Sequence, residues 1–253
     1  MMIVLIHGAW HDASCWRDVA TELRRHGVQV LAVDLPIEDP SHGAEAFART
    51  IVDAIDATGI DERIVVVGHS LGGLVGPVVA QQLGTERVQA IVLVAPMIPE
   101  PGLAHREAVR RDPGIYVLGP GQIRVAPRVT CWDEAAARDV LYAGVVEECI
   151  ERRGLTRSAA EGRIRAEVSH LRPQAWTIDL EVTPLRGWPE VPTTVIVCGA
   201  DRVLSPDRIR DRASRLIPGR VVDIPGGHFP LITMPRRLVE VILSASSDGR
   251  DSP

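Results

Sequence analysis

The chain has 253 residues, of which 45% are hydrophobic and 24% charged, and its formal net charge is −5. This composition is typical of a globular protein with one large or two small domains, and the mild acidity argues against nucleic acid as a partner, since that requires clustered positive charge. All 28 basic residues are Arg, so the Lys of phosphate-binding loops, kinases and Schiff-base enzymes is missing.

Six short apolar runs predict the strands of a mostly parallel sheet. Each holds four or five residues, nearly all apolar and many β-branched, as in strands that helices cover on both faces. The runs are 2–6, 29–33, 64–67, 90–94, 194–198 and 221–224.

Amphipathic stretches between these runs predict the helices that cover the sheet. Between 44 and 55, apolar residues recur at the spacing of one helical face. Residues 16–23, 71–83, 206–217 and 235–243 predict further helices, the last with Pro235 in its first turn. Alternating strands and helices indicate an α/β fold.

The alternation stops at Pro96 and resumes at Thr194. An excursion this long is too large for a loop, and helical patterns at about 133–153 and 156–171 follow a stretch rich in Pro and Gly. We therefore expect a core of residues 1–95 and 193–245, an inserted helical cap at 96–192, and a flexible polar tail at 246–253.

The sequence predicts a cytoplasmic protein without a membrane segment. Its N-terminus lacks the basic region and cleavage site of a signal peptide, and no apolar run reaches the ~20 residues that a membrane span needs. The four Cys are dispersed, without metal-ligand spacing, which favours reduced thiols and no metal site.

Gly68-His69-Ser70-Leu71-Gly72 has the form G-x-S-x-G. It follows a predicted strand and opens a predicted helix, which is the setting of a nucleophile elbow. The sharp turn lifts the Ser hydroxyl above the sheet at the positive end of a helix. Ser70 is therefore the candidate nucleophile.

A Ser nucleophile needs a base and a residue that orients the base. His228 follows the last predicted strand, and Asp201 follows the strand before it, so both belong to the carboxyl edge of the sheet, where such folds bind ligands. We expect Asp201 to orient His228 and His228 to accept the proton of Ser70.

Residues after the first strand complete the expected site. Gly8 allows close backbone approach, so the amides of Ala9 and Leu71 are the candidate oxyanion-hole donors. We expect His7 to brace its loop and His69 to support the elbow.

These motifs resemble the α/β-hydrolase superfamily. Within it, the segments 7–11, 15–16, 34–36 and 68–73 resemble the plant methylesterase and hydroxynitrile lyase group and its bacterial esterase relatives. The resemblance implies an α/β-hydrolase fold with Ser70, Asp201 and His228 as its triad and Ala9 and Leu71 as its oxyanion donors. Lyases of this group carry a Lys after the catalytic His and a hydroxyl residue after the first His, where this chain has Phe229 and Gly8.

The leading hypothesis is a carboxylesterase-like enzyme, without a cofactor, that cleaves a small ester, thioester or lactone. The candidate substrate-binding residues are Trp10, His11, Trp132, Trp176 and Phe229. A cyclase or acyltransferase that uses the same triad with another nucleophile than water remains the main alternative. A hydroxynitrile-type lyase and a non-catalytic receptor are less favoured.

Overall fold

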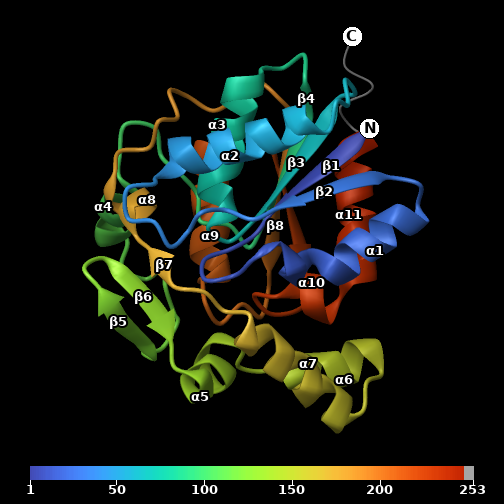
Figure 1. The fold of residues 1–253 in the computed structure, drawn as a ribbon, viewed down its shortest axis with the longest axis vertical. Coiled ribbons are helices and arrows are strands. Elements are labelled where there is room, and N and C mark those ends of the chain that lie inside the picture. The colour runs from blue at the N-terminus through green and yellow to red at the C-terminus, as the bar shows by residue number, and fades with distance from the viewer. Residues whose placement is uncertain (248–253) are drawn as a thin grey trace.

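A computed structural model describes residues 1–247. Its centre is a six-stranded sheet in the order β2-β1-β3-β4-β8-β9, in which all neighbouring strands are parallel (Figure 1). The strands are β1 (Met2–Ile6), β2 (Gln29–Val33), β3 (Ile64–His69), β4 (Val88–Val94), β8 (Thr193–Cys198) and β9 (Arg220–Ile224). The expected parallel α/β sheet is thus confirmed.

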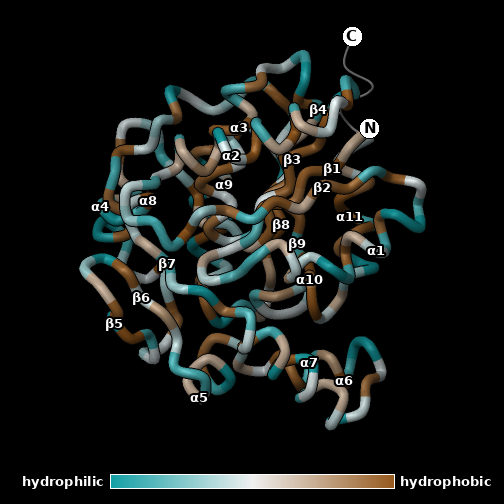
Figure 2. Tube along the Cα trace, viewed as in Figure 1, coloured by the Kyte–Doolittle hydropathy of each residue, from teal (hydrophilic) through white to brown (hydrophobic). Residues whose placement is uncertain are grey.

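The apolar runs form the interior of the sheet. Every residue of β1, β3, β4 and β8 is buried, whereas the edge strands β2 and β9 are partly exposed. Figure 2 shows brown, hydrophobic chain in the central strands and teal segments on the outside of the helices and in the loops. The burial of apolar strands on both faces is the main force that holds the core together.

Helices cover both faces of the sheet. α1 (Arg17–Arg25) packs against α11 (Pro235–Ser247) on one face, and α2 (Ala44–Ala57) packs against α3 (Gly72–Leu83) on the other (Figure 1). A 3₁₀ turn (Ala13–Trp16) precedes α1, and α9 (Pro206–Leu216) and α10 (Pro230–Thr233) follow β8 and β9. Each predicted core helix is present, with ends that differ by a few residues.

Residues 96–192, called the cap below, contain strands as well as helices, which corrects the expectation of a purely helical insertion. The antiparallel sheet β5-β6-β7 lies beside the helices. The buried apolar run that predicts the core strands does not describe β5, in which every residue is exposed. The cap elements are α4 (His105–Arg111), β5 (Gln122–Ala126), β6 (Val129–Trp132), α5 (Glu134–Ala136), a π-helical turn (Ala137–Leu141), α6 (Val145–Arg153), α7 (Arg157–Ser169), β7 (Gln174–Ala175) and α8 (Thr177–Leu180).

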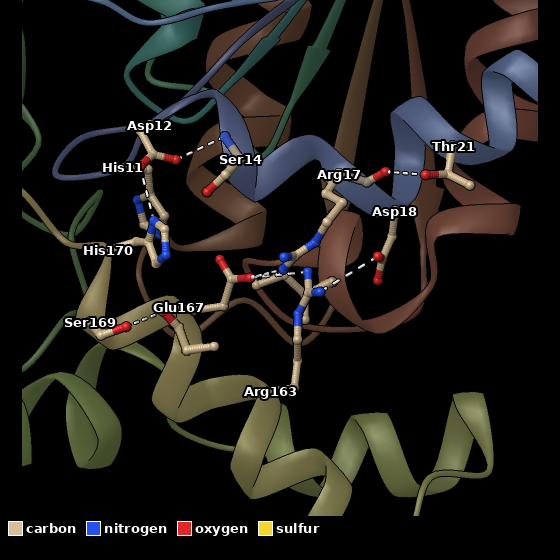
Figure 3. Close-up of polar contacts among 12 residues, drawn as sticks. His11, Asp12, Ser14, Arg17, Asp18, Thr21, Arg163, Glu167, Ser169 and His170 are labelled. Carbon is tan, nitrogen blue, oxygen red and sulfur yellow. Dashed lines mark hydrogen bonds and ion pairs between the residues drawn. The ribbon is translucent and has the colours of Figure 1, made fainter.

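Ion pairs tie the helical end of the cap to α1 of the core (Figure 3). Asp18 accepts from Arg153 of α6 at 2.7 Å and lies 3.5 Å from Arg163 of α7. Glu167, whose side chain is 4% exposed, pairs with Arg163 at 3.0 Å and with Arg17 of α1 at 3.4 Å. Burial raises the pKa of Glu167, and the two guanidinium groups oppose that rise.

The first two residues of the expected tail, Ser246 and Ser247, are helical and belong to α11. The Ser246 hydroxyl donates to the Ile242 carbonyl oxygen at 2.7 Å, and the Ser246 carbonyl oxygen accepts from the side-chain amide of the buried Gln89. The rest of the expected tail, 248–253, lies outside the described residues. Within residues 1–247, no helix has the length and apolar character that crossing a membrane requires.

Candidate active site

Ser70 lies on a sharp turn between β3 and α3. Its φ is +52°, a left-handed conformation that side chains other than Gly rarely adopt. A Cβ on Gly68 would lie 2.4 Å from the Gly72 carbonyl oxygen, and one on Gly72 would lie 2.7 Å from the Ile6 carbonyl oxygen. Both glycines are therefore required by the close approach of the backbone, as the G-x-S-x-G pattern indicates.

Asp201 and His228 form a buried pair on the loops after β8 and β9. The His228 Nδ1–H donates to Asp201 Oδ2 at 2.8 Å, and their side chains are 4% and 3% exposed. The other carboxylate oxygen accepts the amides of Val203 and Leu204 at 2.7 and 2.9 Å. With Nδ1 held by Asp201, the imidazole has Nε2 available as a base.

His69 connects the elbow to the loop of His228. Its Nε2–H donates to the His228 carbonyl oxygen at 2.8 Å, and the two rings lie 4.9 Å apart. Burial holds the pKa of His69 well below its usual value, so the ring is neutral. A Cβ on Gly8 would lie 3.0 Å from His69 Nδ1 and 3.1 Å from Ser70 Cβ, which explains the Gly at that position. The hydrogen bond from His69 to His228 thus joins the Ser70 turn to the loop of His228.

The amides of Ala9 and Leu71 are buried next to Ser70. Both residues are nearly inaccessible, and among residues 1–247 neither amide donates to a protein acceptor. His7 braces the loop of Ala9, because its Nε2 accepts from the Leu35 amide at 3.0 Å and its Nδ1 lies 2.8 Å from the Gly8 carbonyl oxygen. Two unpaired amides beside a Ser hydroxyl are what an oxyanion hole requires.

His11 and Phe229 are buried and do not line the cavity that contains Ser70, which argues against their expected part in substrate binding. The His11 Nδ1–H donates to the Ala9 carbonyl oxygen at 2.7 Å, and its Nε2 accepts from the Tyr142 hydroxyl at 2.8 Å. Burial lowers the pKa of His11 to about 4. The Phe229 ring packs against Tyr142 and His11 at 4.7 and 5.4 Å. Tyr142 was missed because no local pattern marks it.

A cavity of about 380 Å³ contains Ser70 and lies between the core loops and the cap. Of the candidate substrate-binding residues, Trp10 and Trp176 line it, whereas Trp132 is outside the lining with its ring 5.5 Å from that of Trp10. The full lining is Ala9, Trp10, Ser70, Met97, Arg106, Val109, Arg110, Tyr116, Leu118, Gln122, Thr130, Trp176, Asp179 and Val203. Two larger cavities of about 570 Å³ have linings rich in charged residues that do not include Ser70.

The described residues offer little for metal or thiol chemistry. Within 1–247, no group of three or more His, Cys, Asp or Glu is arranged to hold a metal ion. Cys15 and Cys198 are buried, and burial holds the pKa of both thiols well above the usual value. A thiol in that state is a poor nucleophile.

The family model of the α/β-hydrolase family matches residues 3–241, and the chain belongs to this family. Methylesterase 3 of Arabidopsis thaliana is 26% identical over 265 aligned positions that cover 97% of this chain and 95% of the relative. A carbendazim hydrolyzing esterase of Nocardioides is 33% identical over 106 positions, covering 39% of this chain and 43% of the relative.

Solved structures of similar fold include a pyrethroid hydrolase and a methylketone synthase. A pyrethroid hydrolase from Sphingobium faniae has a TM-score of 0.76 and 22% identity, with 100% of this chain and 99% of that chain covered. A variant of tomato methylketone synthase I has a TM-score of 0.77 and 17% identity, with 98% and 97% covered. At these identities the likeness concerns the fold.

Proposed function

We propose that this chain is a serine esterase that cleaves a small carboxylic ester through an acyl-enzyme on Ser70. The observation that carries the proposal is the buried Asp201–His228 hydrogen bond of 2.8 Å, at the same sheet edge as the strained Ser70 turn. A buried carboxylate that holds one imidazole nitrogen fixes the ring as a base for a neighbouring hydroxyl.

The proposed reaction has two steps. His228 Nε2 takes the proton of Ser70 as its oxygen attacks the ester carbonyl, and then gives that proton to the departing alcohol. Water next attacks the acyl-enzyme as His228 takes its proton. His228 then gives that proton to the Ser70 oxygen as the bond to the acyl carbon breaks and the carboxylic acid leaves. The amides of Ala9 and Leu71 would hold the oxyanion in both steps, each contributing roughly 3 kcal/mol.

The names of the relatives support ester hydrolysis in particular. Methylesterases and a carbendazim hydrolyzing esterase are among the proteins to which the chain is similar. The residues also disfavour a lyase of the hydroxynitrile type, because Phe229 and Gly8 stand where such lyases carry an amine and a hydroxyl.

Ser70→Ala tests the proposal directly. We expect the variant to lose at least about a thousandfold in the turnover of p-nitrophenyl acetate, since the nucleophile is gone while the cavity remains. The measurement is steady-state kinetics, with circular dichroism to verify the fold.

A fluorophosphonate probe gives an independent test, because it reacts with activated Ser hydroxyls. Mass spectrometry of the labelled chain should locate the adduct on Ser70, and Ser70→Ala should remain unlabelled. Undiminished turnover in that variant, or labelling at a different Ser, would contradict the proposal.

A further inference from the structure

Three charged side chains line one wall of the cavity that contains Ser70. Arg106 and Arg110 project from α4, and Asp179 belongs to α8. Arg106 Nε donates to the Asp179 carboxylate at 2.8 Å, and the Asp179 side chain is only 11% exposed. The charges of Arg106 and Asp179 therefore cancel each other.

Arg110 is left over from this pairing. It acts on Asp179 at longer range, but among residues 1–247 no ion pair includes the Arg110 guanidinium. Within the lining, two guanidinium groups face one carboxylate, so this wall carries one excess positive charge.

Other polar groups of the wall already have partners. The Thr130 hydroxyl accepts from the indole N–H groups of Trp10 and Trp176 at 3.2 and 2.8 Å. The Tyr116 hydroxyl lies 3.1 Å from His105 Nε2, and burial lowers the pKa of His105 to about 3, so that ring adds no charge. The guanidinium of Arg110 is therefore the group most available to a ligand.

The rest of the lining is mostly apolar and includes Met97, Val109, Leu118 and the rings of Trp10 and Trp176. We propose that the preferred substrate is an ester with an apolar body and one carboxylate, which pairs with Arg110 while the ester carbonyl lies at Ser70. This inference rests on the proposed esterase function and adds the charge of its substrate.

Elementary electrostatics supports a carboxylate in this place. The planar guanidinium matches a carboxylate with two parallel hydrogen bonds, and because Arg110 is exposed, the pair adds a modest gain that depends on salt. A single negative charge balances the single excess positive charge. A neutral ester of the same shape would leave Arg110 without a partner under a bound substrate.

The test compares esters that differ in one carboxylate. One pair is p-nitrophenyl hexanoate and the mono-p-nitrophenyl ester of adipic acid, which places the charge on the acyl side. The other pair is phenyl hexanoate and p-carboxyphenyl hexanoate, which places it on the alcohol side. We expect kcat/KM for the charged member of at least one pair, corrected for the spontaneous rate, to exceed that of its neutral counterpart about five- to tenfold at low salt.

In Arg110→Gln we expect the preference for the charged ester to disappear, because the guanidinium that pairs with the carboxylate is gone. Within residues 1–247 Arg110 is exposed and makes no ion pair, so the variant should fold as the unchanged enzyme does. The matched control is Arg111→Gln, on the same helix, whose guanidinium pairs with Glu107 at 3.5 Å. Arg111 lies outside the cavity lining, so this variant should keep the preference. Added salt should weaken the preference in the unchanged enzyme.

Two results would overturn the inference. One is equal or faster turnover of the neutral member in both pairs, and the other is a preference that persists in Arg110→Gln. Either leaves the esterase proposal intact as long as neutral esters are hydrolysed through Ser70. Turnover that survives Ser70→Ala would instead remove the esterase proposal itself.

Discussion

Two residues beside the cavity adopt a left-handed backbone without being Gly. Ser70 has a φ of +52° and Trp10 a φ of +63°, and such conformations cost about 1–3 kcal/mol each. Surrounding hydrogen bonds hold them in place. The Ser70 amide donates to the Val94 carbonyl at 3.0 Å, and the Arg172 amide donates to the Trp10 carbonyl at 2.8 Å. The strain is thus held at the site by the core on one side and the cap on the other.

Tyr142 connects the cap to the candidate oxyanion hole through His11. In Tyr142→Phe, His11 Nε2 would become a buried acceptor without a partner, so the ring would no longer hold the Ala9 carbonyl in a fixed position. We expect kcat for p-nitrophenyl acetate to fall about tenfold with little change in KM. Steady-state kinetics at several substrate concentrations separates the two constants.

Tyr116→Phe is the comparison, because the Tyr116 hydroxyl likewise contacts a buried His, His105, but does not touch the Ala9 loop, and a Phe ring would keep its place in the cavity lining. It should keep kcat within about twofold of the unchanged enzyme. Equal losses of kcat in both variants would indicate that any buried tyrosine hydroxyl of the cap matters equally, and the role assigned to Tyr142 would be wrong.

The candidate triad could be predicted from the sequence because each member follows an easily recognised strand. Ser70, Asp201 and His228 lie within four residues of strand ends, where chain order fixes their position on the sheet. Tyr142 and Arg110 come from the cap instead, where the local sequence does not determine which residue contacts His11 or which one lines the cavity. Their places depend on long-range packing.

At the scale of elements, parallel pairing places the carboxyl ends of β1, β3, β8 and β9 at one edge of the sheet. The loop of Ala9 follows β1 and Ser70 follows β3. Asp201 follows β8, and His228 follows β9. The strands were predictable because apolar, β-branched runs bury on both faces. β5 was not, because Ile123 and Val125 are about half exposed, at 49% and 53%.

The cap is held to α1 by a cluster of charges rather than by apolar contact alone. Asp18→Asn would remove the carboxylate that pairs with both Arg153 and Arg163, so that Arg163 would keep its pair with Glu167 while Arg153 would lose its ion pair (Figure 3). Because these groups are mostly buried, we expect the free energy of unfolding to fall by about 1–3 kcal/mol. Urea unfolding followed by circular dichroism measures this change.

The control for Asp18→Asn is Glu240→Gln, which removes an exposed pair with Arg237 within α11. That pair is solvated on both sides, so its loss should change stability by less than about 0.5 kcal/mol. A similar small effect at Asp18 would mean that the cap is attached by its apolar contacts, and the role given to the cluster would have to be abandoned.

At the scale of the whole molecule, buried neutral imidazoles should make stability depend on pH. Burial lowers the pKa of His7 and of His11 from 6.5 to about 4, and that of His105 to about 3. Between these values and 6.5 the unfolded chain binds more protons than the folded chain, so stability must fall as the pH falls. Each such His adds a slope that approaches about 1.4 kcal/mol per pH unit.

Urea unfolding at a series of pH values between about 7 and 4.5 measures this dependence. His11→Gln should reduce the slope, because one group that takes up a proton on unfolding is gone. A free energy of unfolding that stays level or rises as the pH is lowered through this range would show that these rings are not neutral in the folded chain.

Most of the residues that line the cavity come from the cap, and fewer come from the core. The candidate catalytic residues stand on loops of the sheet, whereas most of the wall, including both guanidinium groups and Trp176, comes from one continuous stretch between β4 and β8. Substitutions in that stretch can change which molecules fit without moving Ser70 or His228. The residues that would select the substrate thus lie mainly in one segment, apart from the residues that would carry out the reaction. Substitutions in that segment can therefore change the specificity while the reaction stays the same.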